Sequence, residues 1–235
     1  MQELNNQAQD IEQLKEDILG MMDQVLSQLE KAKTALEESD TNIANEILAL
    51  EKKVNATDIS IVKSCENILA LYAPVASDLR FVMAVLNISN QLERIGDHAE
   101  GIAEYIIDEE INIKFSKKIL EGVRFYEMFE IALSMVSDAI YGFTKEDTEI
   151  LKWVFGKDKT LNKINKKIPE IISENTKKKP EPLKQNLYLF SIMKKLERVG
   201  DLAKNIAEET IFYLDAKIIK HKRARKYKEF KKPND

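Results

Sequence analysis

Proline and glycine are scarce in this sequence: five prolines and seven glycines are spread over 235 residues. Both residue types interrupt regular secondary structure, and a protein with many short strands needs them in its turns. Their scarcity therefore excludes a many-turned β architecture and favours long, uninterrupted helices.

Cysteine and histidine are also rare, with Cys65, His98 and His221 as their only members. A single cysteine excludes an internal disulfide and a cluster of thiolate metal ligands. A di-iron enzyme on a helical bundle needs Glu-x-x-His pairs, but Ile95 and Ile218 stand three residues before the two histidines. No glycine-rich phosphate-binding loop and no pair of nucleophile and base is found either. We therefore expect a protein that is not an enzyme.

No apolar run approaches the roughly 20 residues that a membrane-spanning helix needs. The first ten residues, MQELNNQAQD, lack the basic and apolar parts of a signal peptide. We therefore expect a cytoplasmic protein that associates with a membrane only through its partners.

The composition is that of an ordinary globular protein, with 44% hydrophobic and 32% charged residues and a net charge of −4. Positive charge gathers near the C-terminus, where residues 217–232 hold nine lysines and arginines against Glu229. We interpret 217–235 as a basic tail. Because no base-reading motif and no interleaved aromatic residues accompany it, we expect no nucleic-acid partner.

Apolar spacing predicts six helices, and an all-α fold. The predicted helices cover residues 4–36, 41–73, 75–108, 116–143, 145–173 and 183–216. Asp40 and Asp147 stand where helix N-caps are expected. Pro74 should end the second helix, and Pro169 should kink or shorten the fifth.

The second three helices repeat the first three. Residues 92–106 (LERIGDHAEGIAEYI) and 196–210 (LERVGDLAKNIAEET) are identical at nine of fifteen positions. Three long helices joined by short loops pack as an antiparallel bundle. The sequence therefore predicts two tandem three-helix bundles related by duplication, over residues 1–111 and 112–216. A glycine recurs in the middle of both last helices, at Gly96 and Gly200, where it would let a neighbouring helix or a ligand approach closely.

Each repeat carries a pair of acids four residues apart, which places both carboxylates on one face of the helix. A second polar pair on the preceding helix can face each of them, and oxygen ligands from two adjacent helices suit hard cations. The candidate ligands are Glu51, Asn55, Asp58, Glu93, Asp97 and Glu100 in the first repeat, and Asp158, Asn162, Glu197 and Asp201 in the second. The second repeat has Lys204 at the position that Glu100 occupies in the first repeat. Ordinary ion pairs with Arg94 and Arg198, each three residues before an Asp, are the alternative.

These residues resemble the PhoU family, the phosphate-regulon regulators. The resemblance covers nearly the whole chain and is carried by LERIGDHAEGIAE (92–104), LERVGDLAKNIAE (196–208) and PVASDLR (74–80). It implies two three-helix bundles and multinuclear metal clusters held by Glu/Asp-x-x-x-Asp motifs. The implied metal ions are iron or another cation such as zinc, manganese or magnesium. Asn55 and Asn162 stand where the family has acids, which implies fewer ions or weaker binding.

The resemblance also implies a function: negative control of phosphate uptake and of phosphate-starvation signalling. The implied partners are the ATPase subunit of the phosphate ABC transporter, a phosphate-sensing histidine kinase and a second copy of the chain in a homodimer. Two alternatives stay open. One is an accessory module of a sodium–phosphate cotransporter, and the other is an interaction protein without metal.

Overall fold

The structure is a computed structural model that describes residues 2–108, 115–178 and 183–216. Within these residues the chain forms eight α-helices and no strand, which confirms the all-α prediction. The helices are α1 (Gln2–Glu38), α2 (Thr41–Tyr72), α3 (Ala76–Ile107), α4 (Lys117–Gly122), α5 (Phe125–Thr144), α6 (Thr148–Asn165), α7 (Ile168–Lys178) and α8 (Leu183–Asp215).

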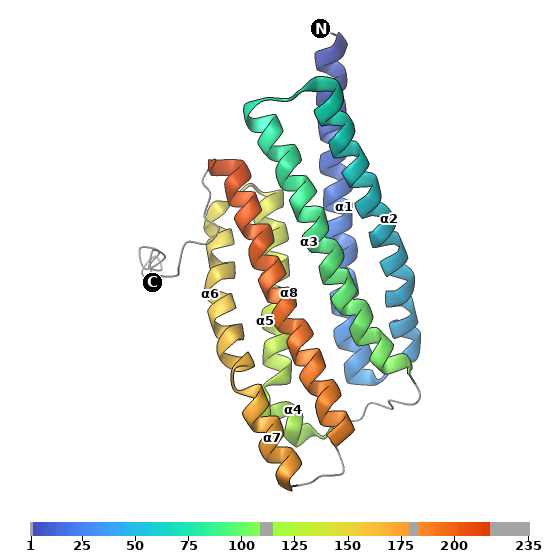
Figure 1. Ribbon diagram of the computed structural model, residues 1–235, viewed down its shortest axis with the longest axis vertical. Helices are drawn as coiled ribbons and strands as arrows, with labels where there is room; N and C mark the ends of the chain where they lie inside the picture. The colour runs from blue at the N-terminus through green and yellow to red at the C-terminus, as the bar shows by residue number, and fades with distance from the viewer. Residues whose placement is uncertain (1, 109–114, 179–182, 217–235) are drawn as a thin grey trace.

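Two three-helix bundles lie side by side (Figure 1). One is made of α1, α2 and α3 and the other of α5, α6 and α8, with α4 and α7 as short additions at one end. Each bundle buries the apolar seam that the spacing predicts, for example at Leu92 and Ile95 in α3 and at Leu196 and Val199 in α8, all fully buried. The two tandem bundles are therefore confirmed.

Two predicted helices are each broken in two. The helix expected over 116–143 stops at Gly122, and Arg124 adopts a left-handed conformation (φ 56°) before α5 begins. The helix expected over 145–173 stops at Asn165. The break comes just ahead of Pro169, which lies in the first turn of α7, where its missing N–H leaves no hydrogen bond unmade. The predicted shortening at Pro169 is thus confirmed. The break at Arg124 was not predicted.

The duplicated helix starts are capped alike. The carboxylate of Asp40 accepts hydrogen bonds from the backbone N–H groups of Asn42 and Ile43 at the start of α2. Asp147 does the same for Glu149 and Ile150 at the start of α6. An Asp in this position stabilises a helix because the first N–H groups have no partner within the helix.

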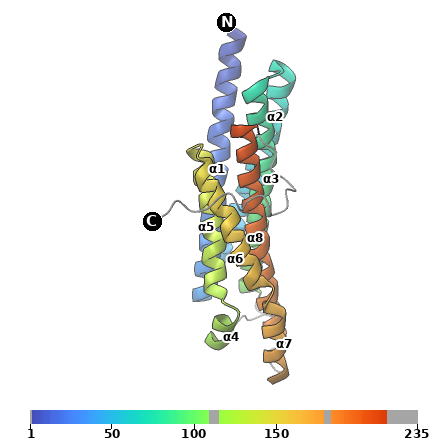
Figure 2. The ribbon, with the colours of Figure 1, turned by 90° about the vertical axis from the view of Figure 1, so that its left-hand side faces the viewer.

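The bundles meet along α3 and α8, with α1 against α5 behind them. Figure 2, turned by 90°, shows the helices of both bundles running along the same long axis. Polar contacts cross the interface: Arg80 Nε donates to the backbone oxygen of Tyr213 at 3.2 Å, and the hydroxyls of Tyr105 and Ser191 lie 2.9 Å apart. The helices that carry the two Glu-x-x-x-Asp pairs, α3 and α8, therefore pack directly against each other.

None of the described helices is long and apolar enough to cross a membrane. The predicted boundary between residues 111 and 112 and the basic tail over 217–235 lie outside the described residues. Cys65 is buried in α2.

Candidate metal-binding sites on the two repeats

Gly96 lets α1 and α2 bring polar side chains against α3. A Cβ at this position would lie 2.5 Å from Glu51 Oε2 and 3.1 Å from Gln28 Oε1. Real Cβ atoms essentially never approach another atom to 2.5 Å, so a larger residue here would force the side chain of Glu51 to shift. The close approach predicted for this glycine is therefore found, and what approaches is a carboxylate.

Glu51 is buried, with 1% of its surface exposed, and it has one strong hydrogen-bond partner. Gln28 Nε2 donates to Glu51 Oε2 at 2.9 Å. Burial, together with the negative charges of Glu100, Asp97 and Glu93 and against the hydrogen bond from Gln28, raises the pKa of Glu51 to about 7. Glu51 is thus half protonated near neutral pH unless a cation offsets the cost of its charge.

Four buried oxygens of the first bundle accept no hydrogen bond: Glu51 Oε1, Gln28 Oε1, Gln24 Oε1 and Asp58 Oδ1. All four are acceptors, so a proton donor or a cation would satisfy them and a further acceptor would not. An orphaned buried acceptor costs about 1–3 kcal/mol. A cation, or a water molecule that donates hydrogen bonds, would therefore satisfy these oxygens.

The carboxylates around Glu51 come from two helices. Burial raises the pKa of Glu93, as do the charges of Asp97 and Asp58. Burial also raises the pKa of Glu100, followed by the charges of Glu104 and Asp97. α2 and α3 thus face each other with like charges, and carboxylate and amide oxygens are the ligands that hard cations prefer.

The structure places two of the predicted ligands of α2 in different surroundings. Asn55 is exposed, whereas Asp58 is half-buried and close enough to Glu93 to raise its pKa. The second carboxylate of α2 therefore comes from Asp58, seven residues after Glu51. In the described part of the chain, no cation forms an ion pair with Glu51, Asp58, Glu93, Asp97 or Glu100.

The second repeat is arranged differently. Lys204 Nζ lies 3.7 Å from Asp158 Oδ2 and 3.8 Å from Asp201 Oδ1. Asn162 Nδ2 donates to the other oxygen of Asp158 at 3.0 Å. The charge of Lys204 opposes the rise in pKa that burial imposes on Asp158. These acids already have partners from the protein.

The remaining acids of α8 are also paired. Arg198 lies 3.9 Å from Asp201, and Lys194 lies 3.9 Å from Glu197. The ion-pair alternative therefore describes the second repeat. It does not describe the first, where Arg94 lowers the pKa of Glu93 but no ion pair joins Arg94 to Asp97.

As the described side chains lie, no group of three or more His, Cys, Asp or Glu could hold a metal ion. The carboxylates of the first repeat would have to turn toward one another to do so, and like charges oppose that movement until a cation is present. The donor set of the first repeat fits a hard cation, because its carboxylates form no ion pair within the described residues and Glu51 and Asp58 each keep one buried oxygen without a hydrogen bond. The donor set of the second repeat does not fit one.

Sequence reasoning missed Gln28, which lies on α1 and donates to Glu51, as part of this site. Gln28 is fully buried next to the apolar seam. A glutamine between Val25 and Leu29 is a polar interruption of an apolar stripe, and this signal could have been used.

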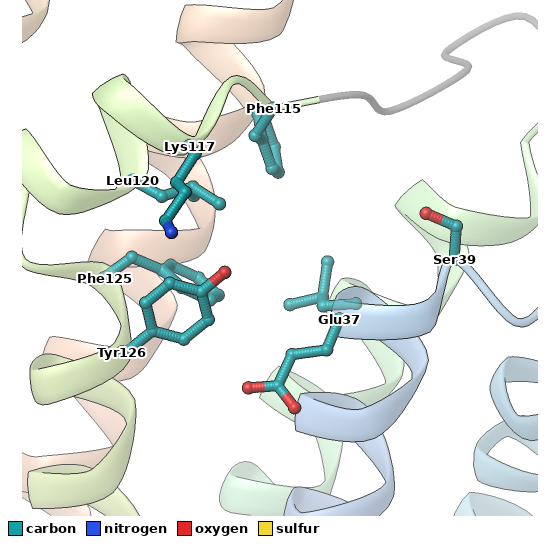
Figure 3. A pocket seen from close by; sticks show the side chains of 8 residues that line it. Glu37, Ser39, Phe115, Lys117, Leu120, Phe125 and Tyr126 are labelled. Atoms are coloured by element: carbon teal, nitrogen blue, oxygen red, sulfur yellow. The ribbon is translucent and has the colours of Figure 1, made fainter.

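Two hollows elsewhere do not contain the duplicated acids of the first repeat. A cavity of about 330 Å³ lies between the end of α1 and the start of α5, with Phe115, Leu120, Phe125 and Tyr126 facing Glu37 (Figure 3). A second cavity of about 270 Å³ lies between α3 and α8, lined by Arg94, His98 and Arg198 and also by Asp201 and Lys204 of the second repeat. Burial, then Lys195, Arg94 and Arg198, lowers the pKa of His98 to about 4, so this histidine is neutral at pH 7.

Comparison with known proteins supports the resemblance. The family model described as the PhoU domain matches the chain twice, over residues 18–106 and 125–210. The phosphate-specific transport system accessory protein PhoU homolog 1 of Thermotoga maritima is 30% identical over 181 residues, which are 76% of this chain and 75% of the relative. The PhoU homolog of Aquifex aeolicus is 30% identical over 184 residues, or 77% of this chain and 80% of the relative.

Solved structures match over most of the chain. The crystal structure of PhoU from Pseudomonas aeruginosa has a TM-score of 0.83 and 26% identity, and the match covers 89% of this chain and 99% of that one. The phosphate transport system regulatory protein PhoU from Streptococcus pneumoniae has a TM-score of 0.79 and 26% identity, covering 91% and 99%.

Proposed function

The chain belongs to the PhoU family, and from this premise we propose that it is a non-enzymatic accessory protein of phosphate-specific transport. It restrains phosphate uptake and phosphate-starvation signalling. The observation that carries this proposal is the double match to the PhoU domain, one match on each bundle. The names of its relatives, which describe accessory proteins of a phosphate-specific transport system, support it.

The protein acts by contact in the cytoplasm. Its partners are the ATPase subunit of the phosphate transporter and a phosphate-sensing histidine kinase, and it forms a homodimer. The two adjacent bundles present long helical faces on which the charged residues are arranged differently. Charged surfaces of this kind favour specific docking.

The first repeat holds metal ions through Glu51, Asp58, Glu93, Asp97 and Glu100. The ions are iron or another divalent or trivalent cation such as zinc, manganese or magnesium. A bound cation would neutralise carboxylates that otherwise repel one another, and it would join α2 to α3. The unpaired acceptors of Glu51 and Asp58 support this part of the proposal.

The test is co-purification from phosphate-replete cells. We expect the tagged wild-type chain to retain the transporter ATPase and the sensor kinase. A Glu93→Ala/Asp97→Ala variant should retain less of at least one of them, and a Lys159→Ala variant, altered at an exposed site on α6, serves as the matched control.

Two outcomes contradict the proposal. If the wild type retains neither partner, the role in phosphate-specific transport is wrong. If it retains a sodium–phosphate cotransporter instead, the accessory-module alternative replaces it.

A further inference from the structure

The two repeats carry opposite charges at one position beside their acidic pairs. The nine identities between residues 92–106 and 196–210 place Lys204 at the position that Glu100 has in the first repeat. The carboxylate of Glu100 adds to the negative charge around Glu51 and helps to raise its pKa. Lys204 instead adds a positive charge in the middle of the second set of acids.

The ammonium group of Lys204 joins the two helices that the second site would use. It lies 3.7 Å from Asp158 on α6 and 3.8 Å from Asp201 on its own helix, α8. The second oxygen of Asp158 accepts from Asn162 at 3.0 Å. Both oxygens of Asp158 are therefore engaged by side chains of the protein, and a metal ion would have to displace a tethered cation to reach them.

The layer beneath the two sites also differs. The glycine of the first repeat, Gly96, faces the polar atoms of Glu51 and Gln28. Its counterpart, Gly200, faces apolar atoms, with Leu161 Cδ1 at 3.2 Å and Met135 Sδ at 3.4 Å from a Cβ built there. No buried carboxylate therefore lies against Gly200, in contrast to Gly96.

We propose that the ammonium group of Lys204 is the resident cation of the second repeat, where it takes the place of a metal ion, so that metal is bound by the first repeat alone. This inference rests on the metal binding included in the proposed function. Lys204 links α6 to α8 whether or not metal is present, whereas a metal ion would add a link between α2 and α3 to the packing that already joins them. Metal availability then changes one bundle of the protein and leaves the other unchanged.

Equilibrium dialysis of the full chain against Mn²⁺, followed by metal analysis, tests the inference. We expect wild-type metal content in Asp158→Asn/Asp201→Asn and loss of metal in Glu93→Ala/Asp97→Ala. Lys204→Glu, which places in the second repeat the acid that the first repeat has, should bind additional Mn²⁺. Lys159→Glu changes the charge by the same amount at an exposed neighbour of Asp158 and should not bind more.

Two results of these binding measurements would overturn the inference. If Asp158→Asn/Asp201→Asn loses a substantial part of the wild-type metal, the second repeat binds metal despite Lys204, and the inference is overturned while the proposed metal binding stands. If Lys204→Glu binds no more Mn²⁺ than Lys159→Glu, the inference is also overturned.

If the wild type binds no Mn²⁺ at all, the proposed metal binding is wrong, and thermal unfolding decides the role of Lys204. Lys204→Gln should then lower the melting temperature more than Lys159→Gln, because it leaves Asp158 and Asp201 without their shared cation. An equal effect of the two substitutions would show that Lys204 is an ordinary surface lysine.

Discussion

Among single residues, Glu51 couples the stability of the metal-free protein to pH. Its folded-state pKa of about 7 lies above the value near 4.3 that a glutamate has in an unfolded chain. The folded state therefore binds the proton more tightly, and this contribution to stability is complete below pH 4.3 and lost as the pH rises to about 7. The full effect is roughly 4 kcal/mol.

We expect chelator-treated wild type to lose more stability between pH 5 and pH 8 than Glu51→Gln, which keeps the shape of the side chain and cannot titrate. Urea unfolding at the two pH values measures the difference. Equal losses in the two proteins would contradict the raised pKa of Glu51.

Cys65 should be unreactive in the folded protein. Burial raises the pKa of its thiol to about 12, and its Sγ lies 3.7 Å from the backbone oxygen of Val82. Because the thiolate is the reactive species, its reaction with a disulfide reagent at pH 8 should be on the order of a thousandfold slower than in the unfolded chain. The rate measured by absorbance, with and without urea, checks this, and similar rates in both conditions would be inconsistent with a buried thiol.

At the scale of helices, the two repeated glycines should respond differently to the same substitution. Gly96→Ala places a methyl group 2.5 Å from the buried carboxylate of Glu51, whereas Gly200→Ala meets only the flexible ends of Leu161 and Met135 at 3.2–3.4 Å. Alanine favours the helix by about 1 kcal/mol at either site. We expect a net loss of about 1–2 kcal/mol for Gly96→Ala and little net change for Gly200→Ala.

Denaturant unfolding of the two variants measures this contrast. Metal binding offers a second measurement, since Gly96→Ala should also weaken Mn²⁺ binding by displacing Glu51. Equal stability of the two variants would mean that α2 can move away from Gly96 without cost.

For the whole molecule, metal should stabilise one bundle and not the other. The bundles share the interface of α3 with α8, but the acids without ion-pair partners lie on α2 and α3, and the paired ones lie on α6 and α8. Hydrogen exchange with and without Mn²⁺ should therefore show slower exchange in α2 and no change in α6. Protection of both helices to the same extent would contradict the difference between the repeats.

The sequence alone leaves open which polar residues of α2 face α3. Residues four positions apart share a helix face only approximately, because an α-helix has 3.6 residues per turn. Asn55 is therefore rotated about 40° around the helix axis from Glu51, and Asp58 is rotated about 20° in the opposite direction. Asn55 is exposed to solvent, whereas Asp58 is half-buried and lies near enough to Glu93 on α3 to raise its pKa. The sequence predicts the two possible neighbours, but the packing of α2 against α3 selects one.

The sequence by itself determined the helical fold, the duplication, the caps at Asp40 and Asp147, and the family. All of these depend on residues close together in the chain or on a repeated pattern, and local hydrogen bonding and apolar spacing are sufficient for them. Only the tertiary structure decided that Glu51 is buried against Gly96 and that Lys204 bridges Asp158 and Asp201. Both facts require helices that are far apart in the sequence to meet at a particular angle and depth, because burial and long-range charge pairing are properties of the packed bundle.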